Sequence, residues 1–433
     1  MTGWSGGAAR RVYSALLVLL MPAYLLRLWW RGSKEPLYRH AIGERLGRYA
    51  APPSATGWIW VHAVSLGETR AAAALVDALR ARRPGMRLLL THGTATGMEA
   101  GRSLLRDGDA QTWLPYDTPG AVRRFLRHFQ PAVGVLMETE IWPNLLHAAQ
   151  QVSLPMVLAN ARLSDKSLRK GERLAALIRP AVQSLRLVLA QTDRDAHRLR
   201  ASGADPVIVS GNLKFDVAPD VAQLHHGKAW RAALRREVVL AAVTREGEEA
   251  MLLDAWRQVA EPRPLLLIVP RHPQRFDDVA ALIRAAGLSV ARRSAWAAAQ
   301  SPDLPPPEAL AAPVWLGDSM REMALYYGCA DVALLGGSFA PLGGQNLIEA
   351  AACGCPMVLG PHTFNFAEAA ELSIAAGAAV RAADMTQALV QAQAMIAPEV
   401  QQRFSTHALA FASLHRGAAD RMADAVLASM PAA

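Results

Sequence analysis

The sequence predicts an α/β protein of two domains, each built around a parallel sheet. Short apolar runs alternate with helical patterns along the chain, and few segments show the period-two alternation of a half-exposed sheet. The length, 433 residues, exceeds one typical domain, and with 52% hydrophobic residues the chain can fill two large cores. An apolar stretch precedes the first domain.

The composition restricts the class of partner and the compartment. A formal net charge of +9 favours a phosphorylated substrate or anionic lipid. Nucleic acid is the weaker option, because the chain shows no recognition helix, zinc-finger spacing or RNP-like motif, and we expect no such partner. The three cysteines, Cys329, Cys353 and Cys355, are typical of a reducing compartment, and the last two lack a second ligand pair for zinc. We therefore expect no bound metal.

Residues 1–32 are predicted to form a membrane anchor. Residues 12–26 are mostly apolar, although this stretch is marginal against the roughly 20 residues of a full span. Trp29 and Trp30 lie among basic residues, as in an interfacial belt, and no cleavage site of small residues follows. The slightly larger number of basic residues after the stretch favours a body on the cytoplasmic side. A buried N-terminal helix is the alternative.

The first domain is expected to span residues 33–216. The strand Trp58–Ala63 leads into Ser65 and Glu68, where a helix begins that Ser65 can cap. Because ligands of open α/β sheets bind at the carboxyl ends of the strands, Glu68 suits a general base. An acid in the first helical turn also complements the helix dipole, and both interpretations stay open.

A pair of acids follows a later strand of the same domain. Glu138 and Glu140 come after the predicted strand 131–137 and share one face of an extended segment. If both face a ligand site, their repulsion raises one pKa; the alternative is pairing with nearby arginines. Further strands are expected at 86–91, 154–159, 185–190 and 206–209, and the segment 211–216 with Lys214 ends the domain.

After a predicted linker at 217–235, a second domain is expected over residues 236–405. Its strands are predicted at 238–242, 265–270, 314–316, 332–335 and 356–359. Arg271, His272 and Arg275 follow the second of these strands, and such a cluster is typical of a phosphate clamp. An exposed basic loop is the alternative. Residues 406–433 are predicted to form a helix that packs back across the domains.

A glycine-rich loop follows the strand 332–335. Gly336, Gly337, Gly343 and Gly344 leave its backbone N–H groups open to a ligand, and a helix begins at Gln345 and Asn346. A loop of this kind feeding a helix N-terminus is a natural anion site, and Glu349 on that helix suits a sugar hydroxyl. The alternative is a crossover whose glycines serve only tight packing.

Ordered blocks of residues from Arg45 to Glu371 resemble the 3-deoxy-D-manno-octulosonic acid (Kdo) transferases of lipopolysaccharide biosynthesis. These blocks are Arg45-Leu-Gly47, Trp60-Val-His-Ala-Val-Ser-Leu-Gly-Glu68, Leu114-Pro-Tyr-Asp117, Glu138-Thr-Glu-Ile-Trp-Pro-Asn144, Asn160-Ala-Arg-Leu-Ser164, Gly211-Asn-Leu-Lys-Phe-Asp216, Pro270-Arg-His-Pro273, Gly317-Asp-Ser-Met320, Gly336-Gly-Ser338 and Gly343-Gly-Gln-Asn-Leu-Ile-Glu349. One departure is Arg245, which stands where the family usually has a histidine.

The resemblance implies a GT-B glycosyltransferase, with two Rossmann-like domains facing across a cleft behind an N-terminal membrane-anchor helix. It implies CMP-Kdo as donor, a lipid A precursor as acceptor, inner-membrane lipid as a further partner, and neither metal nor cofactor. Glu68 then looks like the general base. The donor side is expected to comprise Arg271, His272, Gly336, Gly337, Ser338, Asn346 and Glu349. Ser65, Arg70, Glu138, Glu140 and Lys214 are expected on the acceptor side or in structural roles.

Two other functions are compatible with parts of the pattern. Non-hydrolysing sugar-nucleotide 2-epimerases share the architecture, but they are soluble and lack the Glu68 block. A membrane-tethered nucleotide-sugar sensor would need no poised acid. The motifs do not fix the number of Kdo residues transferred or the oligomeric state.

Overall fold

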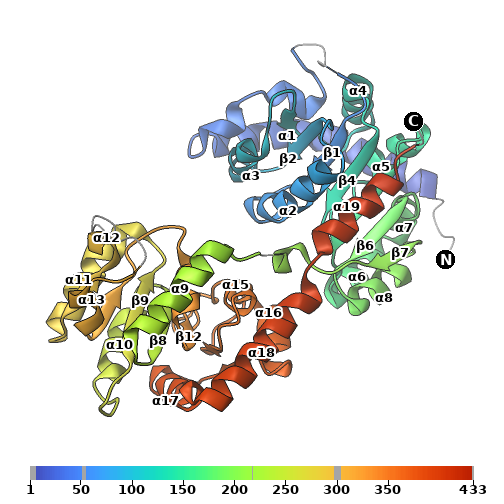
Figure 1. The fold of residues 1–433 in the computed structure, drawn as a ribbon. Coiled ribbons are helices and arrows are strands. Elements are labelled where there is room, and N and C mark those ends of the chain that lie inside the picture. Colours follow the sequence, from blue (N-terminus) through green and yellow to red (C-terminus); the bar gives the residue numbers. More distant parts are fainter. Residues whose placement is uncertain (1–5, 51–54, 217, 297–303, 432–433) are drawn as a thin grey trace. The chain divides into compact units, whose positions relative to one another are not determined.

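The computed structural model describes residues 6–50, 55–216, 218–296 and 304–431, and the chain divides into two compact units (Figure 1). Unit 1 runs to Asp216 and includes the final segment from Arg416, whereas unit 2 comprises residues 217–415. The chain therefore passes between the units twice. Parts of the predicted anchor (1–5), linker (217) and C-terminal segment (432–433) lie outside the described residues.

Unit 1 contains a seven-stranded sheet in the order β3-β2-β1-β4-β5-β6-β7, and all of its neighbouring strands are parallel. Buried side chains alternate between two cores: Trp60 and Leu136 lie in one, Val61 and Val135 in the other. Both faces are thus covered, as parallel strands require. The strands are β1 (Ile59–His62), β2 (Leu88–His92), β3 (Ala110–Trp113), β4 (Val133–Met137), β5 (Met156–Ala161), β6 (Leu187–Ala190) and β7 (Val207–Val209).

Most helices of unit 1 begin at short polar side chains or prolines. Thr94, Ser164 and Thr192 each accept a backbone N–H at the start of a helix. The helices are α1 (Gly6–Arg31), α2 (Leu66–Arg82), α3 (Ala95–Gly101), α4 (Pro119–Phe129), α5 (Pro143–Gln151), α6 (Asp165–Arg173), α7 (Ala175–Gln183), α8 (Asp193–Ala201) and α19 (Ala418–Ala428). Short 3-10 helices lie at Pro36–Arg39, Ile42–Leu46, Arg102–Leu104 and Leu213–Phe215.

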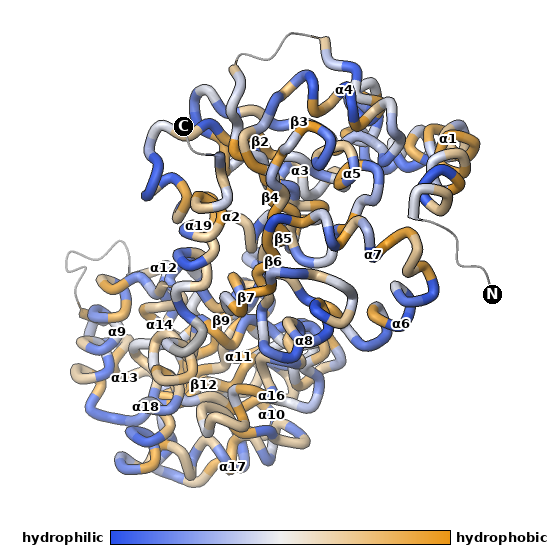
Figure 2. Tube along the Cα trace, turned by 90° about the vertical axis from the view of Figure 1, so that its right-hand side faces the viewer, coloured by the Kyte–Doolittle hydropathy of each residue, from blue (hydrophilic) through white to orange (hydrophobic). Residues whose placement is uncertain are grey.

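Unit 2 contains a second parallel sheet, in the order β10-β11-β9-β8-β12-β13-β14. Figure 2 shows hydrophobic residues gathered along the strands, with hydrophilic residues at the periphery. The strands are β8 (Val238–Thr244), β9 (Leu265–Pro270), β10 (Val290–Arg292), β11 (Val314–Leu316), β12 (Val332–Leu335), β13 (Met357–Leu359) and β14 (Ala379–Arg381). The helices are α9 (Val221–Leu234), α10 (Glu248–Trp256), α11 (Phe276–Ala285), α12 (Arg293–Trp296), α13 (Pro307–Ala311), α14 (Met323–Cys329), α15 (Leu347–Ala352), α16 (Ala367–Ala375), α17 (Met385–Ile396) and α18 (Pro398–His415), with a 3-10 turn at Pro273–Arg275.

Several elements differ from the sequence prediction. Most of the expected linker is the helix α9, which packs against α14 and so belongs to unit 2. The expected single C-terminal helix is interrupted at Gly417, whose φ of +76° ends the helical path; α18 packs on unit 2 and α19 on unit 1. The edge strands β10 and β14 are three residues long and only partly buried, so their apolar signal is weak.

The polar turn before α14 does not cap that helix. The carboxylate of Asp318 accepts hydrogen bonds from Arg292 and Ser294 instead of capping the next helix. Helix α14 begins at Met323 without a capping side chain.

Candidate functional site

Each sheet has one point where the strand order reverses direction. In unit 1 this switch point lies between β1 and β4, and in unit 2 it lies between β8 and β12. Loops that leave the carboxyl ends of such neighbouring strands diverge and open a crevice where α/β proteins bind ligands. Glu68 and Glu138 follow β1 and β4, and Gly336 follows β12. Most of the predicted site residues therefore fall at or beside the two switch points.

Glu68 lies in the first turn of α2 and is partly buried. Its carboxylate accepts hydrogen bonds from the Val64 backbone N–H over 2.8 Å and from the Ser65 hydroxyl over 3.0 Å. Ser65 accepts in return from the Glu68 N–H, so it is the helix cap that the sequence predicts. Burial raises the pKa of Glu68 above its usual value, and the negative charge of Glu138 adds to this, against the two hydrogen bonds.

Glu138 and Glu140 lie close enough to Glu68 for their charges to act on one another. Glu138 follows β4 with a φ of +58°, is 8% exposed and pairs with Arg162 over 3.2 Å. Burial, followed by the negative charge of Glu68, raises the pKa of Glu140 to about 7. Glu138 thus pairs with an arginine, as one interpretation of the acid pair held, whereas the pKa of Glu140 is raised mainly by burial and only in small part by Glu138. Glu68, Glu138 and Glu140 are named the acid cluster below.

The other predicted residues of unit 1 take different places. Arg70 is exposed on α2, two residues beyond Glu68. Lys214 is exposed in the 3-10 turn after β7, and the turn is fixed because the Leu213 N–H donates to Asn160 Oδ1 over 3.0 Å. Asn160 itself lies near the carboxyl end of β5. The structure therefore places Lys214 on a strand-end loop of the same sheet.

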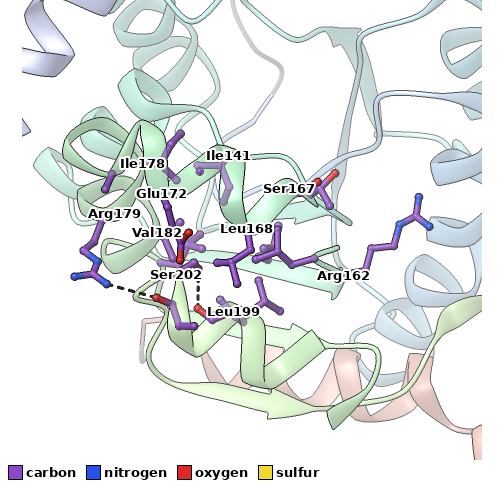
Figure 3. Close-up of a pocket in the computed structure, with 18 of the residues that line it drawn as sticks. Ile141, Arg162, Ser167, Leu168, Glu172, Ile178, Arg179, Val182, Leu199 and Ser202 are labelled. Atoms are coloured by element: carbon purple, nitrogen blue, oxygen red, sulfur yellow. Dashed lines mark hydrogen bonds between the residues drawn. The ribbon is translucent and has the colours of Figure 1, made fainter. Parts of the chain in front are cut away.

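An apolar pocket adjoins the acid cluster in unit 1 (Figure 3). It lies among β5, β6 and the helices α6, α7 and α8, and Ile141, Val182 and Leu199 line it. Glu138 and Arg162 are part of its rim, so the pocket begins at the same ion pair that borders the cluster. The sequence alone did not indicate this pocket.

In unit 2, Arg271 and Glu349 lie close enough to interact electrostatically. Arg271 is exposed directly after β9, and His272 beside it is partly buried. Burial raises the pKa of Glu349 above its usual value, and the positive charge of Arg271 opposes this rise. Asn346 caps α15, since its side chain accepts from the Ile348 N–H over 3.2 Å. Arg271, Asn346 and Glu349 therefore belong to neighbouring strand-end segments.

The N–H groups at the start of the glycine loop are directed into the protein. Glu248 is 1% exposed, and its carboxylate accepts from the backbone N–H of Gly337 over 2.7 Å and of Phe339 over 3.0 Å. The Gly336 N–H donates to the Ala242 carbonyl. The prediction that these N–H groups are open to a ligand is thus wrong for Gly336 and Gly337.

Packing explains the glycines and the serine of this loop. A β-carbon on Gly336 would come within 2.5 Å of the Val243 carbonyl oxygen, and Gly337 has a φ of +70°. Ser338 is 1% exposed, and its hydroxyl accepts from the Gly360 N–H over 2.8 Å. Donor contact by these three residues stays a prediction; the contacts present here support the loop itself.

Two arginines near the loop have protein partners. Arg275, which the sequence placed in a phosphate clamp, makes two hydrogen bonds to Glu249, of 2.7 and 2.9 Å, and that carboxylate is fully buried. The clamp prediction is therefore wrong for Arg275. Arg245, the departure from the family pattern, pairs with Glu246 over 3.1 Å.

No group of three or more His, Cys, Asp or Glu side chains with metal-binding geometry occurs in the part of the chain that the structure describes. Sequence reasoning missed the roles of Glu248, which shapes the loop, and Arg162, which borders the acid cluster. Glu248 is 89 residues from its partner Gly337 in the sequence, and Arg162 is 24 residues from its partner Glu138. Only the fold brings these partners together.

Comparison with known proteins identifies the family. The family model of the 3-deoxy-D-manno-octulosonic-acid transferases (kdotransferases) matches residues 40–217. The chain is 49% identical to a 3-deoxy-D-manno-octulosonic acid transferase of Bordetella pertussis, over 96% of this chain and 98% of the relative. Its identity to the transferase of Haemophilus influenzae is 35%, over 83% and 84% of the two chains.

Solved structures show the same fold at low sequence identity. A UDP-GlcNAc 2-epimerase from Neisseria meningitidis matches with a TM-score of 0.52 and 14% identity, over 86% of this chain and 100% of its own. The glycotransferase of kitacinnamycin matches with a TM-score of 0.53 and 14% identity, over 87% and 100%. The two parallel sheets confirm the predicted GT-B fold class. With near-full-length similarity to enzymes of one activity, the chain belongs to the 3-deoxy-D-manno-octulosonic acid transferase family.

Proposed function

We propose that this Kdo transferase moves Kdo from CMP-Kdo to a glucosamine hydroxyl of the lipid A precursor lipid IVA, with inversion at the anomeric carbon. The observation that carries the proposal is the acid cluster at the switch point of unit 1. A carboxylate whose pKa is raised by burial is a stronger base than one in water, and Glu68 is such a group at a helix N-terminus beside two further acids.

Glu68 is the general base of this proposal. Each of its oxygens accepts one hydrogen bond from the protein, and a carboxylate oxygen has a second lone pair that a sugar hydroxyl can approach. The Val64 N–H and the Ser65 hydroxyl fix the orientation of the carboxylate. As the hydroxyl oxygen bonds to the anomeric carbon of Kdo, its proton passes to Glu68 and CMP departs with the bonding electrons.

The pocket beside the cluster supports a lipid acceptor. Its lining is mostly apolar, and its rim carries the Glu138–Arg162 pair. A lipid acceptor has a polar sugar head group and apolar acyl chains. The head group would lie at the charged Glu138–Arg162 pair, and an acyl chain would enter the apolar pocket. Exposed Lys166, Arg169 and Lys170 on the neighbouring helix α6 add positive charge for the phosphates of such a lipid.

The donor is proposed to bind at the switch point of unit 2. Exposed Arg271 would pair with the phosphate of CMP, and Glu349 would accept from a donor hydroxyl. This reaction needs no metal, because charge on the departing phosphate is met by arginine. We further propose that α1 holds the enzyme at the cytoplasmic face of the inner membrane.

The test is transfer by purified protein, with the lipid product weighed by mass spectrometry. Glu68→Gln should lower kcat by about 10²–10⁴-fold with little change in donor KM, because a neutral amide cannot take the proton. Glu99→Gln, at an exposed acid of α3 in the same unit, is the matched control and should act like the wild type. Near-normal turnover by Glu68→Gln would remove Glu68 from the mechanism. The number of Kdo masses added also counts the sugars transferred.

A further inference from the structure

Helix α1 is fastened to unit 1 near its N-terminal end. Ser14 Oγ donates to Asn144 Oδ1 over 2.9 Å, Arg10 donates to the same oxygen over 3.3 Å, and the Tyr13 hydroxyl donates to Asp117 over 3.0 Å. Asp117 and Asn144 are 3% and 2% exposed and are bonded to each other through the Asn144 backbone and amide groups. The helix therefore docks on a buried polar pair that the domain holds in place.

The C-terminal half of α1 is fastened as well. Leu28 is 8% exposed and packs with Tyr38 and Ala95, and the Tyr24 ring lies 5.7 Å from that of Tyr116. Along the helix, buried or half-buried side chains recur every three or four residues, at positions 10, 14, 17, 21, 25 and 28. One face of α1 thus lies against unit 1 from end to end.

The opposite face of α1 is apolar and open. Figure 2 shows hydrophobic residues along this helix at the edge of the unit. Large hydrophobic side chains on it are between 42% and 75% exposed, namely Val12, Leu16, Val18, Leu19, Leu20, Leu26, Trp29 and Trp30. Exposed arginines flank this face, and aromatic residues stand at one end, as in segments that lie in the membrane interface.

The uncharged stretch of α1 is too short to cross a bilayer without burying charge. α1 is long and apolar enough as a whole to be a candidate span, but Arg11 and Arg27 bound only residues 12–26. At 1.5 Å per residue, these roughly 15 residues extend about 22 Å, against about 30 Å of hydrocarbon. A crossing helix would also have to leave Asp117 and Asn144, or carry their surroundings into the lipid.

We propose that α1 lies in the plane of the membrane surface as a monotopic anchor, with its open apolar face in one leaflet rich in anionic lipid. This proposal rests on the membrane attachment in the proposed function, but not on the identity of donor or acceptor. Arg11, Arg27 and Arg31 then lie at the level of the phosphate head groups. One face of the helix holds the enzyme and the other holds the lipid.

This arrangement also positions the acid cluster. Asn144, which holds α1, lies in the first turn of α5, and the segment between β4 and α5 carries Glu138 and Glu140. The membrane helix is therefore joined to the reactive segment through the first turn of α5. It fixes the height of the acid cluster above the leaflet, where a lipid acceptor presents its sugar.

Cysteine labelling in sealed vesicles tests the proposal. Gly7→Cys marks the start of α1, where a β-carbon meets nothing within 4 Å; Lys34→Cys marks the exposed residue after its end; and Ala281→Cys marks exposed α11 in unit 2. The native cysteines Cys329, Cys353 and Cys355 are buried and give a low background. Each variant is reconstituted into vesicles of phosphatidylethanolamine and phosphatidylglycerol and treated with a membrane-impermeant maleimide, before and after permeabilisation.

The in-plane helix predicts one result for all three variants. The fraction labelled before permeabilisation should agree within about two-fold, because the three positions lie on the same side of the bilayer. A spanning helix would place Gly7 on the opposite side of the bilayer from Lys34 and Ala281. Gly7→Cys would then be labelled in those molecules in which the other two positions are protected, and that result would overturn the proposal. Failure of the protein to float with the vesicles would also overturn it, whereas transfer measured in detergent would leave the proposed activity standing.

Discussion

Glu248 gives the sharpest test of how unit 2 builds its donor side. This buried carboxylate accepts the backbone N–H groups of Arg245, Gly337 and Phe339 over 2.9, 2.7 and 3.0 Å, so it joins the ends of β8 and β12 across the switch point. The substitution Glu248→Gln keeps the shape of the side chain but replaces one accepting oxygen with a donating NH₂ group.

The expected cost follows from these contacts. At least one buried N–H then faces a donor, which costs about 1–3 kcal/mol, and the remaining bonds lose the strength that a charged acceptor gives. We expect a total of about 2–4 kcal/mol. For a domain of this size, each kcal/mol lowers Tm by about 2–4 °C, so Tm of unit 2 should fall by about 4–16 °C.

Thermal unfolding followed by circular dichroism measures this loss, and hydrogen exchange of the peptide over residues 336–340 shows whether it arises in the loop. Glu246→Gln is the matched control: it is two residues away, exposed, and pairs with Arg245, so its effect should stay within about 0.5 kcal/mol. Equal Tm values for the two variants, with unchanged exchange in the loop, would refute the role assigned to Glu248.

Two further predictions concern the other buried acids. Arg275→Met should destabilise unit 2 by about 3–5 kcal/mol in urea unfolding, because it leaves the fully buried charge of Glu249 without its partner. Arg271→Met is its control: exposed Arg271 should change stability little, but its loss should raise donor KM, and the reverse pattern would contradict both assignments. For Glu140, the folded pKa of about 7 exceeds the ordinary 4.5, so the folded state binds the extra proton and stability falls as pH rises between these values. Glu140→Gln should therefore match the wild type at pH 4 and exceed it at pH 8, by at most about 3 kcal/mol; equal Tm values at both pH values would show that the group titrates normally.

Much of the fold could be predicted because its signals are local. Central strands such as β9 and β12 are continuous apolar runs, and Ser65 caps its helix through a contact three residues away. Glu68 could be singled out for the same reason, since it lies in the first helical turn after a strand. The short edge strands and the break at Gly417 gave no such signal, because partial burial and one left-handed residue leave little trace in composition.

The residues that shape the sites could not be assigned from the sequence. Arg275 and Arg271 look alike in the loop after β9, but Arg275 is bound to Glu249 and Arg271 is exposed. Glu246 and Glu248 are likewise acids two residues apart in one polar turn; Glu246 is exposed, whereas Glu248 is 1% exposed. Which member of each pair meets solvent depends on partners that the fold brings together.

The sequence by itself determined that this protein is a two-domain α/β transferase with an apolar N-terminal helix and acids placed after its strands. The fold class, the helix and the positions of the acids follow from periodicity and short-range contacts, which the order of residues encodes directly, whereas the transferase activity follows from motif blocks that resemble a known family. Only the tertiary structure decided that Glu68, Glu138 and Glu140 share one charged neighbourhood, that the glycine loop is bonded to Glu248, and that α1 lies along its own domain. Burial and long-range pairing set these outcomes, and both depend on the packing of distant segments.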